Sequence, residues 1–444
     1  MTRLQSREWH SQQSNQRVEE ICSSIADCSL TSVVKKVESL AFENREIHEQ
    51  QCINLNPATN TLNPRAETLL ASGIGSRPSL GHPGEKYEMG LEAIESIEVI
   101  AAELACRVFD ADFAEIRVGS GALCNLYSFM ACCKPGDTII VPPAAIGGHV
   151  THQSTGAAGL YGLNIIEAPV AQGRYTVDTE GVRQLAAKHQ AKLITIGGSL
   201  NLEHHPIAEL RAIADSCGAK LLFDAAHLSG LIAGRQWQQP LSEGAHLISM
   251  STYKSLGGPA GGLIVSNDAE LMARIDQIAF PGLTANFDAA KSAALAVTLA
   301  DWLDSGRDYA KAMCDTASAL RTACAEQDLP VFSLANNATP SHQFALEAAR
   351  FGGGQHMATK LRQANILTCG IGLPIAEVSG DMNGLRIGTP ELPRWGMGAR
   401  HMPTIATWLA DALFQRRDLK QIATEVSKFR AEFTHIHYAM PPEA

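Results

Sequence analysis

Apolar and polar positions alternate along this chain in a way that predicts strands and helices in turn. Apolar runs typical of buried strands occur near Phe113–Val118, Thr138–Val141, Asn164–Glu167, Lys192–Ile196, Lys220–Phe223, His246–Met250 and Gly262–Ser266. Segments with apolar residues at helical spacing separate most of them, notably Glu92–Phe109, Thr179–His189 and Ile207–Cys217. This alternation predicts an α/β fold with a mixed, mostly parallel, seven-stranded sheet between helices.

The same pattern divides the chain into four segments. We expect a helical arm at 1–52, a large α/β domain at 53–285, a long linking helix at 286–328 and a small α+β domain at 329–444. The length of 444 residues supports more than one core. The arm either reaches a partner subunit or caps its own domain, and the sequence leaves both open.

Composition excludes several classes of protein. Hydrophobic residues make up 45% and charged residues 18%, and no apolar run reaches the roughly 18 residues of a membrane span. The first residues lack the pattern of a secretory signal. The eleven cysteines are irregularly spaced, and the net charge of -10 disfavours nucleic-acid binding. We therefore expect a soluble cytoplasmic protein without disulfides or zinc, and without membrane or nucleic-acid partners.

Asp224 and Lys254 are the residues whose position suggests chemistry. Asp224 ends the apolar run at 221–223, and Lys254 lies in the glycine-rich loop after the next predicted strand. Strand ends of open α/β sheets face the ligand crevice. There, a lysine amine can form a Schiff base with pyridoxal phosphate, and a carboxylate can keep its pyridine nitrogen protonated. The ordinary alternative, a surface lysine, is disfavoured by the flanking apolar strands.

Three further features fit an anionic cofactor and an amino-acid substrate. The turn Gly119–Ala122 joins a predicted strand to a helix and offers free N–H groups to a phosphate, although such turns are often only structural. His149 and His227 are placed to contact a cofactor, or are structural histidines. Arg386 has apolar neighbours, so its guanidinium needs an anion, either a substrate carboxylate or an internal one.

Four motifs in this order resemble those of the serine hydroxymethyltransferase family of fold-type I pyridoxal-phosphate enzymes, over about residues 50 to 410. They are GGHVTH, FDAAHLSGLIAG, STYKSLGGPAGG and LRIGTPELPRWGM. The resemblance implies Lys254 as the Schiff-base lysine, Asp224 as the pyridinium partner and His149 as the ring-stacking residue. It also implies that His227 neighbours the cofactor hydroxyl and that Arg386 anchors the substrate carboxylate. Cofactor contacts are implied for Ser120, Gly121, Ala122 and Ser251. The family's assembly implies a homodimer, or a tetramer, with shared active sites.

The irregular stretch from Asn54 to Glu88, which we expect to be a loop forming one wall of the site, departs from the family pattern between Ala58 and Glu88. NPATN resembles the family's ASEN element with Ala58 in place of a substrate-binding serine. In GHPGEKYEMG, Tyr87 matches the first tyrosine of the family's YPGxRYYGG, so Ala58 and Tyr87 are expected substrate contacts. The other departures are Glu88 for the second tyrosine, Leu80 for the folate-site glutamate, Pro78 for a tyrosine, Tyr253 for a histidine, and no glycine pair after Phe280-Pro281-Gly282.

We therefore predict an enzyme that forms or breaks the Cα–Cβ bond of a β-hydroxy-α-amino acid, with an aldehyde as the second reactant. Since Leu80 cannot move a proton, aldolase, transaldolase or α-substituted-serine hydroxymethyltransferase chemistry without tetrahydrofolate is favoured. Folate-dependent serine hydroxymethyl transfer is one alternative. Racemisation, decarboxylation or transamination on the same scaffold, and a non-catalytic homologue, are others. The general base stays unassigned.

Overall fold

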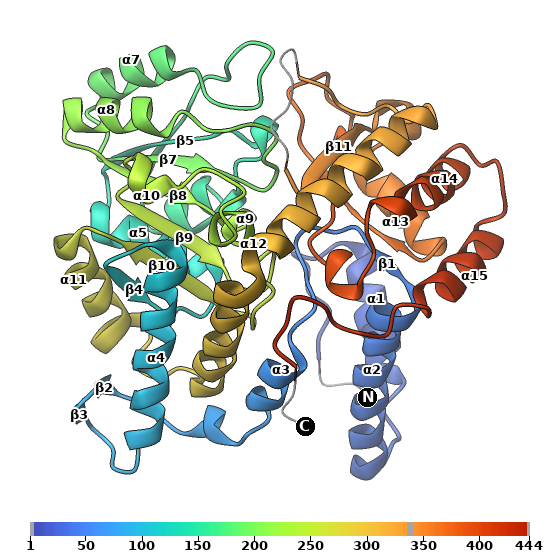
Figure 1. The fold of residues 1–444 in the computed structure, drawn as a ribbon, viewed down its shortest axis with the longest axis horizontal. Coiled ribbons are helices and arrows are strands. Elements are labelled where there is room, and N and C mark those ends of the chain that lie inside the picture. The colour runs from blue at the N-terminus through green and yellow to red at the C-terminus, as the bar shows by residue number, and fades with distance from the viewer. Residues whose placement is uncertain (1–3, 335–340, 442–444) are drawn as a thin grey trace.

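A seven-stranded sheet forms the centre of the larger part of the molecule (Figure 1). The computed structural model describes residues 4–334 and 341–441. The strand order is β4-β10-β9-β8-β7-β5-β6, and β10 alone runs opposite to the other six strands. The strands are β4 (Phe113–Glu115), β5 (Thr138–Val141), β6 (Asn164–Glu167), β7 (Leu193–Gly197), β8 (Lys220–Asp224), β9 (Leu247–Ser251) and β10 (Gly262–Ser266). The predicted fold class is confirmed.

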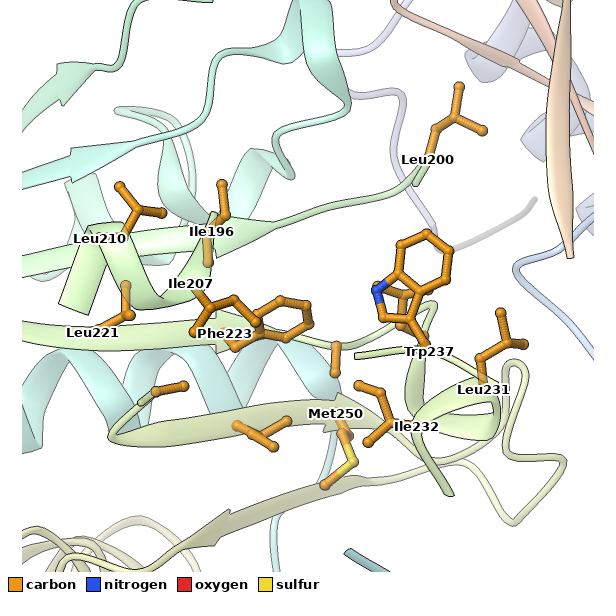
Figure 2. Packing of buried hydrophobic residues seen from close by; sticks show 14 of the residues in the cluster. Ile196, Leu200, Ile207, Leu210, Leu221, Phe223, Leu231, Ile232, Trp237 and Met250 are labelled. Carbon is orange, nitrogen blue, oxygen red and sulfur yellow. The ribbon is translucent and has the colours of Figure 1, made fainter. Parts of the chain in front are cut away.

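Alternate residues of each strand face different helices. On β8, Leu221 and Phe223 pack with α7 and α8, whereas Leu222 packs with α5 and α11 on the other face. Figure 2 shows Leu221, Phe223 and Ile196 of the sheet beside Ile207 and Leu210 of α8. The helices are α5 (Gly121–Cys132), α7 (Thr179–His189), α8 (Ile207–Cys217) and α11 (Ala269–Gln277). Burial on both faces explains why these strands are almost wholly apolar.

A long helix, α12 (Ala289–Glu326), runs from the central sheet to the C-terminal part of the chain (Figure 1). Its last turns join a second apolar cluster with the C-terminal strands and helices. That part contains the antiparallel sheet β11-β14-β13 and the parallel pair β1-β12. The bounds are β1 (Ile53–Asn54), β11 (Gln343–Glu347), β12 (Ile366–Leu367), β13 (Cys369–Ile371), β14 (Gly384–Gly388), α13 (Gly354–Gln363), α14 (Met402–Leu413) and α15 (Leu419–Arg430). The predicted division into four segments stays a prediction.

Within the described residues, four α-helices precede the first strand of the large sheet. In the first 50 residues, α1 (Gln12–Ser23) and α2 (Leu30–Glu46) have no buried residue. The helix α4 (Glu92–Phe109) has the predicted bounds. It carries acidic side chains in its first turn, where a negative charge interacts favourably with the positive end of the helix dipole. No helix within the described ranges is long and apolar enough to cross a membrane.

Two predicted elements differ from the structure. The strand expected at 113–118 ends at Glu115, whose carboxylate accepts from the Arg117 backbone N–H at 2.7 Å and turns the chain. The stretch 54–88, expected to be a loop, contains α3 (Pro64–Leu70), with Pro64 in its first turn and an Asn63 cap that irregular composition concealed.

Candidate active site

Asp224 lies at the carboxyl end of β8 and holds a network of buried polar groups. Its Oδ2 accepts hydrogen bonds from Asn125 Nδ2 at 2.9 Å and His152 Nε2 at 3.0 Å, and its Oδ1 accepts from the Ala226 N–H at 3.0 Å. Burial alone would raise the pKa of this carboxyl. The His152 hydrogen bond and the nearby imidazoles nevertheless hold the pKa well below its ordinary value. Asp224 is therefore a permanently charged acceptor inside the fold.

Lys254 follows β9 and is 7% exposed. Its Nζ lies 3.1 Å from His227 Nε2. Burial lowers the pKa of the amine to about 8, with the Arg386 charge adding to this effect and Asp224 opposing it. Burial, Lys254 and Arg386 likewise lower the pKa of His227 well below its ordinary value. The lysine therefore reaches its reactive neutral form at a lower pH than an exposed lysine does, beside an uncharged imidazole.

Arg386 on β14 enters the same buried cluster from the C-terminal part of the chain. Its Nη1 donates to the Ser199 carbonyl at 2.6 Å and lies 3.3 Å from His227 Nε2. Its Nη2 and Nε donate to Cys369 Sγ at 3.1 and 3.4 Å. Within the described ranges, the hydrogen bonds of Arg386 engage no carboxylate. The guanidinium is therefore a buried cation suited to an anionic ligand.

The turn before α5 packs closely against the side chain of Ser251 at the end of β9. Ser120 caps the helix and accepts from the Leu123 N–H at 3.2 Å. A Cβ at Gly121 would lie 2.1 Å from Ser251 Oγ, so a larger residue would displace the Ser251 side chain at the end of β9. The first N–H groups of a helix have no partner within it. Ser120, Gly121, Ala122 and Ser251 together provide a small polar cradle that fits a phosphate.

The structure brings together most, but not all, of the residues predicted for the site. His149 is half-buried, and its Nδ1 lies 2.9 Å from Thr151 Oγ1, while burial lowers the pKa of its imidazole. Ala58 is linked to Arg386 through two other residues. Its N–H donates to Asn56 Oδ1 at 3.0 Å, and the same oxygen accepts from Cys369 Sγ at 3.3 Å. Cys369 Sγ in turn accepts from Arg386. Tyr87 is not part of this cluster.

The loop residues of the expected substrate wall lie outside the buried cluster. Tyr87 is 81% exposed and follows the hairpin of β2 (Gly81–His82) and β3 (Glu85–Lys86). The next residue, Glu88, has a buried Oε2 without a hydrogen-bond partner among the described residues. Leu80 is half-buried, and its carbonyl accepts from the Tyr87 N–H at 3.1 Å.

Sequence reasoning missed four residues of the cluster. They are Asn125, His152, Gln343 and Cys369. His152 could have been predicted, because it stands in the same GGHVTH segment as His149. Asn125 stands one helical turn after the predicted phosphate turn Gly119–Ala122, but nothing in that turn indicates a contact with Asp224. Gln343 and Cys369 lie far from any site motif, and only the packing of distant segments brings them to His227 or Arg386.

The arrangement defines an enzyme of the pyridoxal-phosphate class, and comparisons with known proteins identify the family. The family model described as serine hydroxymethyltransferase matches residues 33–409. The chain belongs to the serine hydroxymethyltransferase family. It is 59% identical over 435 residues to an alpha-methylserine aldolase of Variovorax paradoxus, covering 98% of each chain. It is 58% identical over 401 residues to an alpha-methylserine aldolase of a Ralstonia species, covering 90% of this chain and 92% of the relative.

More distant relatives carry the family name itself. The serine hydroxymethyltransferase of Staphylothermus marinus is 33% identical over 407 residues, covering 91% of this chain and 93% of the relative. The crystal structure of L-threonine transaldolase from Pseudomonas fluorescens has the same fold, with a TM-score of 0.84 and 22% identity, covering 92% and 94% of the two chains. The predictions of the family, of a pyridoxal-phosphate enzyme and of Cα–Cβ bond chemistry on a β-hydroxy-α-amino acid are confirmed.

Proposed function

We propose that this protein catalyses the folate-independent aldol cleavage of α-methylserine to alanine and formaldehyde, and its reverse. One observation carries the proposal: the alpha-methylserine aldolases are 58–59% identical to this chain over at least 90% of its length. The serine hydroxymethyltransferases among its relatives reach 32–35%. The altered loop from Ala58 to Glu88 supports the same choice.

The buried cluster supports pyridoxal phosphate as the cofactor. When bound, this group withdraws electrons from the Cα of an attached amino acid. In our proposal Lys254 is the attachment point, Asp224 keeps the ring nitrogen protonated, and His149 lies against the ring. His227 lies next to the cofactor hydroxyl. The phosphate contacts are assigned to Ser120, Gly121, Ala122 and Ser251.

Arg386 binds the substrate in this proposal, and Ala58 and Tyr87 make further contacts with it. The guanidinium has no carboxylate hydrogen-bond partner within the described ranges, which supports a role in holding the α-carboxylate. Ala58, smaller than serine, leaves room near this anchor. During cleavage a base takes the β-hydroxyl proton, formaldehyde departs, and a proton is returned to Cα to give alanine. The base stays unassigned.

Independence from tetrahydrofolate follows from the side chain at position 80. A glutamate stands at this position in the family pattern, and the aliphatic Leu80 can neither donate nor accept a proton. Aldol cleavage releases free formaldehyde and needs no carrier for it. The cofactor of this reaction is therefore pyridoxal phosphate alone.

Assembly and location complete the proposal. The 81% exposure of Tyr87 supports a homodimer or tetramer in which this residue contributes to the neighbouring subunit's site. The cytoplasm is the proposed location. Sedimentation of the purified protein tests the assembly, because a stable monomer with full activity would contradict shared active sites.

The experiment that tests the proposal compares substrates with and without tetrahydrofolate. Both enantiomers of α-methylserine, serine, threonine and an aryl-serine are incubated with the enzyme, and aldehyde and amino-acid products are measured. We expect alanine and formaldehyde in equal amounts from one α-methylserine enantiomer, with no effect of folate. Lys254→Ala is the inactive control. Strictly folate-dependent serine cleavage would overturn the proposal, and loss of chirality without aldehyde would indicate a racemase.

A further inference from the structure

Cys369 lies directly opposite Arg386 in the antiparallel pairing of β13 with β14. Side chains of such cross-strand partners stand on the same face of a sheet, close enough to touch. Here the sulfur accepts hydrogen bonds from Arg386 Nη2 at 3.1 Å and from Nε at 3.4 Å. The thiol therefore faces the side edge of the guanidinium, where these two nitrogens point their N–H groups in the same direction.

The proton of this thiol has a defined acceptor in Asn56. The Asn56 Oδ1 atom accepts from the Ala58 N–H at 3.0 Å. Since a backbone N–H can only donate, this atom is the oxygen of the amide. Cys369 Sγ lies 3.3 Å from the same oxygen, so its S–H donates there. The lone pairs of the sulfur are thereby left for the N–H groups of Arg386.

Arg386 is held from two sides by these contacts. Its Nη1 donates to the Ser199 carbonyl at 2.6 Å, while Cys369 holds Nε and Nη2. Each terminal nitrogen of a guanidinium has two N–H groups, and the sulfur accepts one of the two on Nη2. Among the described residues no other acceptor binds Nη2. Its second N–H is therefore available to an anion, in an orientation that the sulfur sets.

We propose that Cys369 is a positioning residue that orients the Arg386 guanidinium for the α-carboxylate of the substrate. The inference rests on the proposed function, which assigns Arg386 to that carboxylate. Sulfur is a weak acceptor, so it orients the guanidinium without neutralising its charge. A carboxylate at position 369 would instead pair with the cation and compete with the substrate. Through Asn56, the same thiol links the anchor to the segment that carries Ala58.

Calorimetric titration of the full-length protein with bound pyridoxal phosphate tests the proposal. The ligands are alanine and alaninol, which has the same amine but no carboxylate. Cys369→Ala should weaken alanine binding by about three- to tenfold, the equivalent of one weak hydrogen bond, and leave alaninol binding unchanged. Cys369→Asp should weaken alanine binding further, by roughly 100-fold, because its carboxylate occupies Arg386. Cys369→Ser should stay within about threefold of the wild type, since a hydroxyl also donates and accepts.

Cys217→Ala is the matched control. This cysteine is also half-buried, and its thiol donates to the backbone carbonyls of Ile213 and Ala214. Alanine and alaninol should bind to this variant as they bind to the wild type. A merely structural role for Cys369 would weaken the binding of both ligands equally in Cys369→Ala, and that result would overturn the proposal. Unchanged or tighter alanine binding in Cys369→Ala, or a Cys369→Ser variant as weak as Cys369→Ala, would overturn it too.

Steady-state kinetics give a second readout. Cys369→Ala should raise KM for α-methylserine by about three- to tenfold with kcat changed less than about twofold, because the carboxylate contact is made before and during the reaction alike. The titrations are repeated with serine and serinol, so that they do not depend on α-methylserine as the substrate. If α-methylserine is not cleaved but the carboxylate-dependent loss is seen, the proposed function fails and the role of Cys369 stands.

Discussion

The imidazole of His152 donates from Nε2 to Oδ2 of Asp224 across 3.0 Å, and both side chains are buried. The other ring nitrogen of His152 has no hydrogen-bond partner in the described part of the chain. With one nitrogen committed to Asp224, His152 stabilises a carboxylate that is also held by Asn125. A buried negative charge is costly unless such donors surround it, so this cluster keeps Asp224 ionised inside the fold.

Replacing Asp224 by asparagine removes that charge while keeping the shape. We expect turnover to fall by at least about 100-fold, because the ring nitrogen of the cofactor loses its anionic partner. Cofactor affinity, measured by the recovery of visible absorbance on titration, should fall as well. Asp215→Asn, which breaks only the surface pair with Arg211, is the control. Unchanged turnover in Asp224→Asn would remove Asp224 from the site.

The sequence predicted those features that depend on local pattern. The bounds of α4, α7 and α8 follow from apolar periodicity and agree with the structure to the residue. Asp224 and Lys254 were found because strand ends in an α/β sheet share one edge. In contrast, Gln343 contacts His227 from 116 residues away in the sequence. No motif near Gln343 indicates that its side chain belongs to the site. Gln343 contacts Ser199, Asn201 and His227 only because β11 packs beside the large sheet in the folded protein.

The pKa of the Lys254 amine, lowered to about 8 by burial, sets a pH dependence for cofactor capture. Only the neutral amine attacks the aldehyde of pyridoxal phosphate. The capture rate should therefore rise with pH up to about 8 and then level off, rather than rise toward the value near 10.4 of an ordinary lysine. Stopped-flow absorbance on protein stripped of cofactor measures this profile. A rate still rising steeply at pH 9.5 would show that the amine is not perturbed.

Arg386 offers a direct test of substrate anchoring. Arg386→Lys keeps the charge but loses the planar fork, so we expect KM for α-methylserine to rise by about 10- to 100-fold, the equivalent of one or two charge-assisted hydrogen bonds. The visible absorbance of the bound cofactor should change little. Arg274→Lys, in an exposed pair with Glu270, is the matched control. An unchanged KM together with lost cofactor would instead assign Arg386 to the cofactor half.

Buried neutral histidines predict how stability depends on pH. Burial lowers the pKa of His205 to about 4, and its Nε2 lies 3.0 Å from Asn201 Oδ1. Unfolded His205 titrates near 6.5, so between pH 6.5 and 4 the unfolded chain binds more protons than the folded one. Stability is therefore complete above pH 6.5 and decreases as pH falls toward 4, by on the order of 3 kcal/mol for this residue.

His205→Gln, which retains an N–H donor for Asn201, removes this titration. The free energy of unfolding, measured by urea denaturation at saturating cofactor from pH 7 to 4.5, should then decline less steeply than in the wild type. Part of the slope will remain, because burial also lowers the pKa of His246 to about 4 and that of His342 to about 3. Exposed His435→Gln is the control and should leave the slope unchanged. Identical slopes in His205→Gln and wild type would mean that His205 is already solvated in the native state.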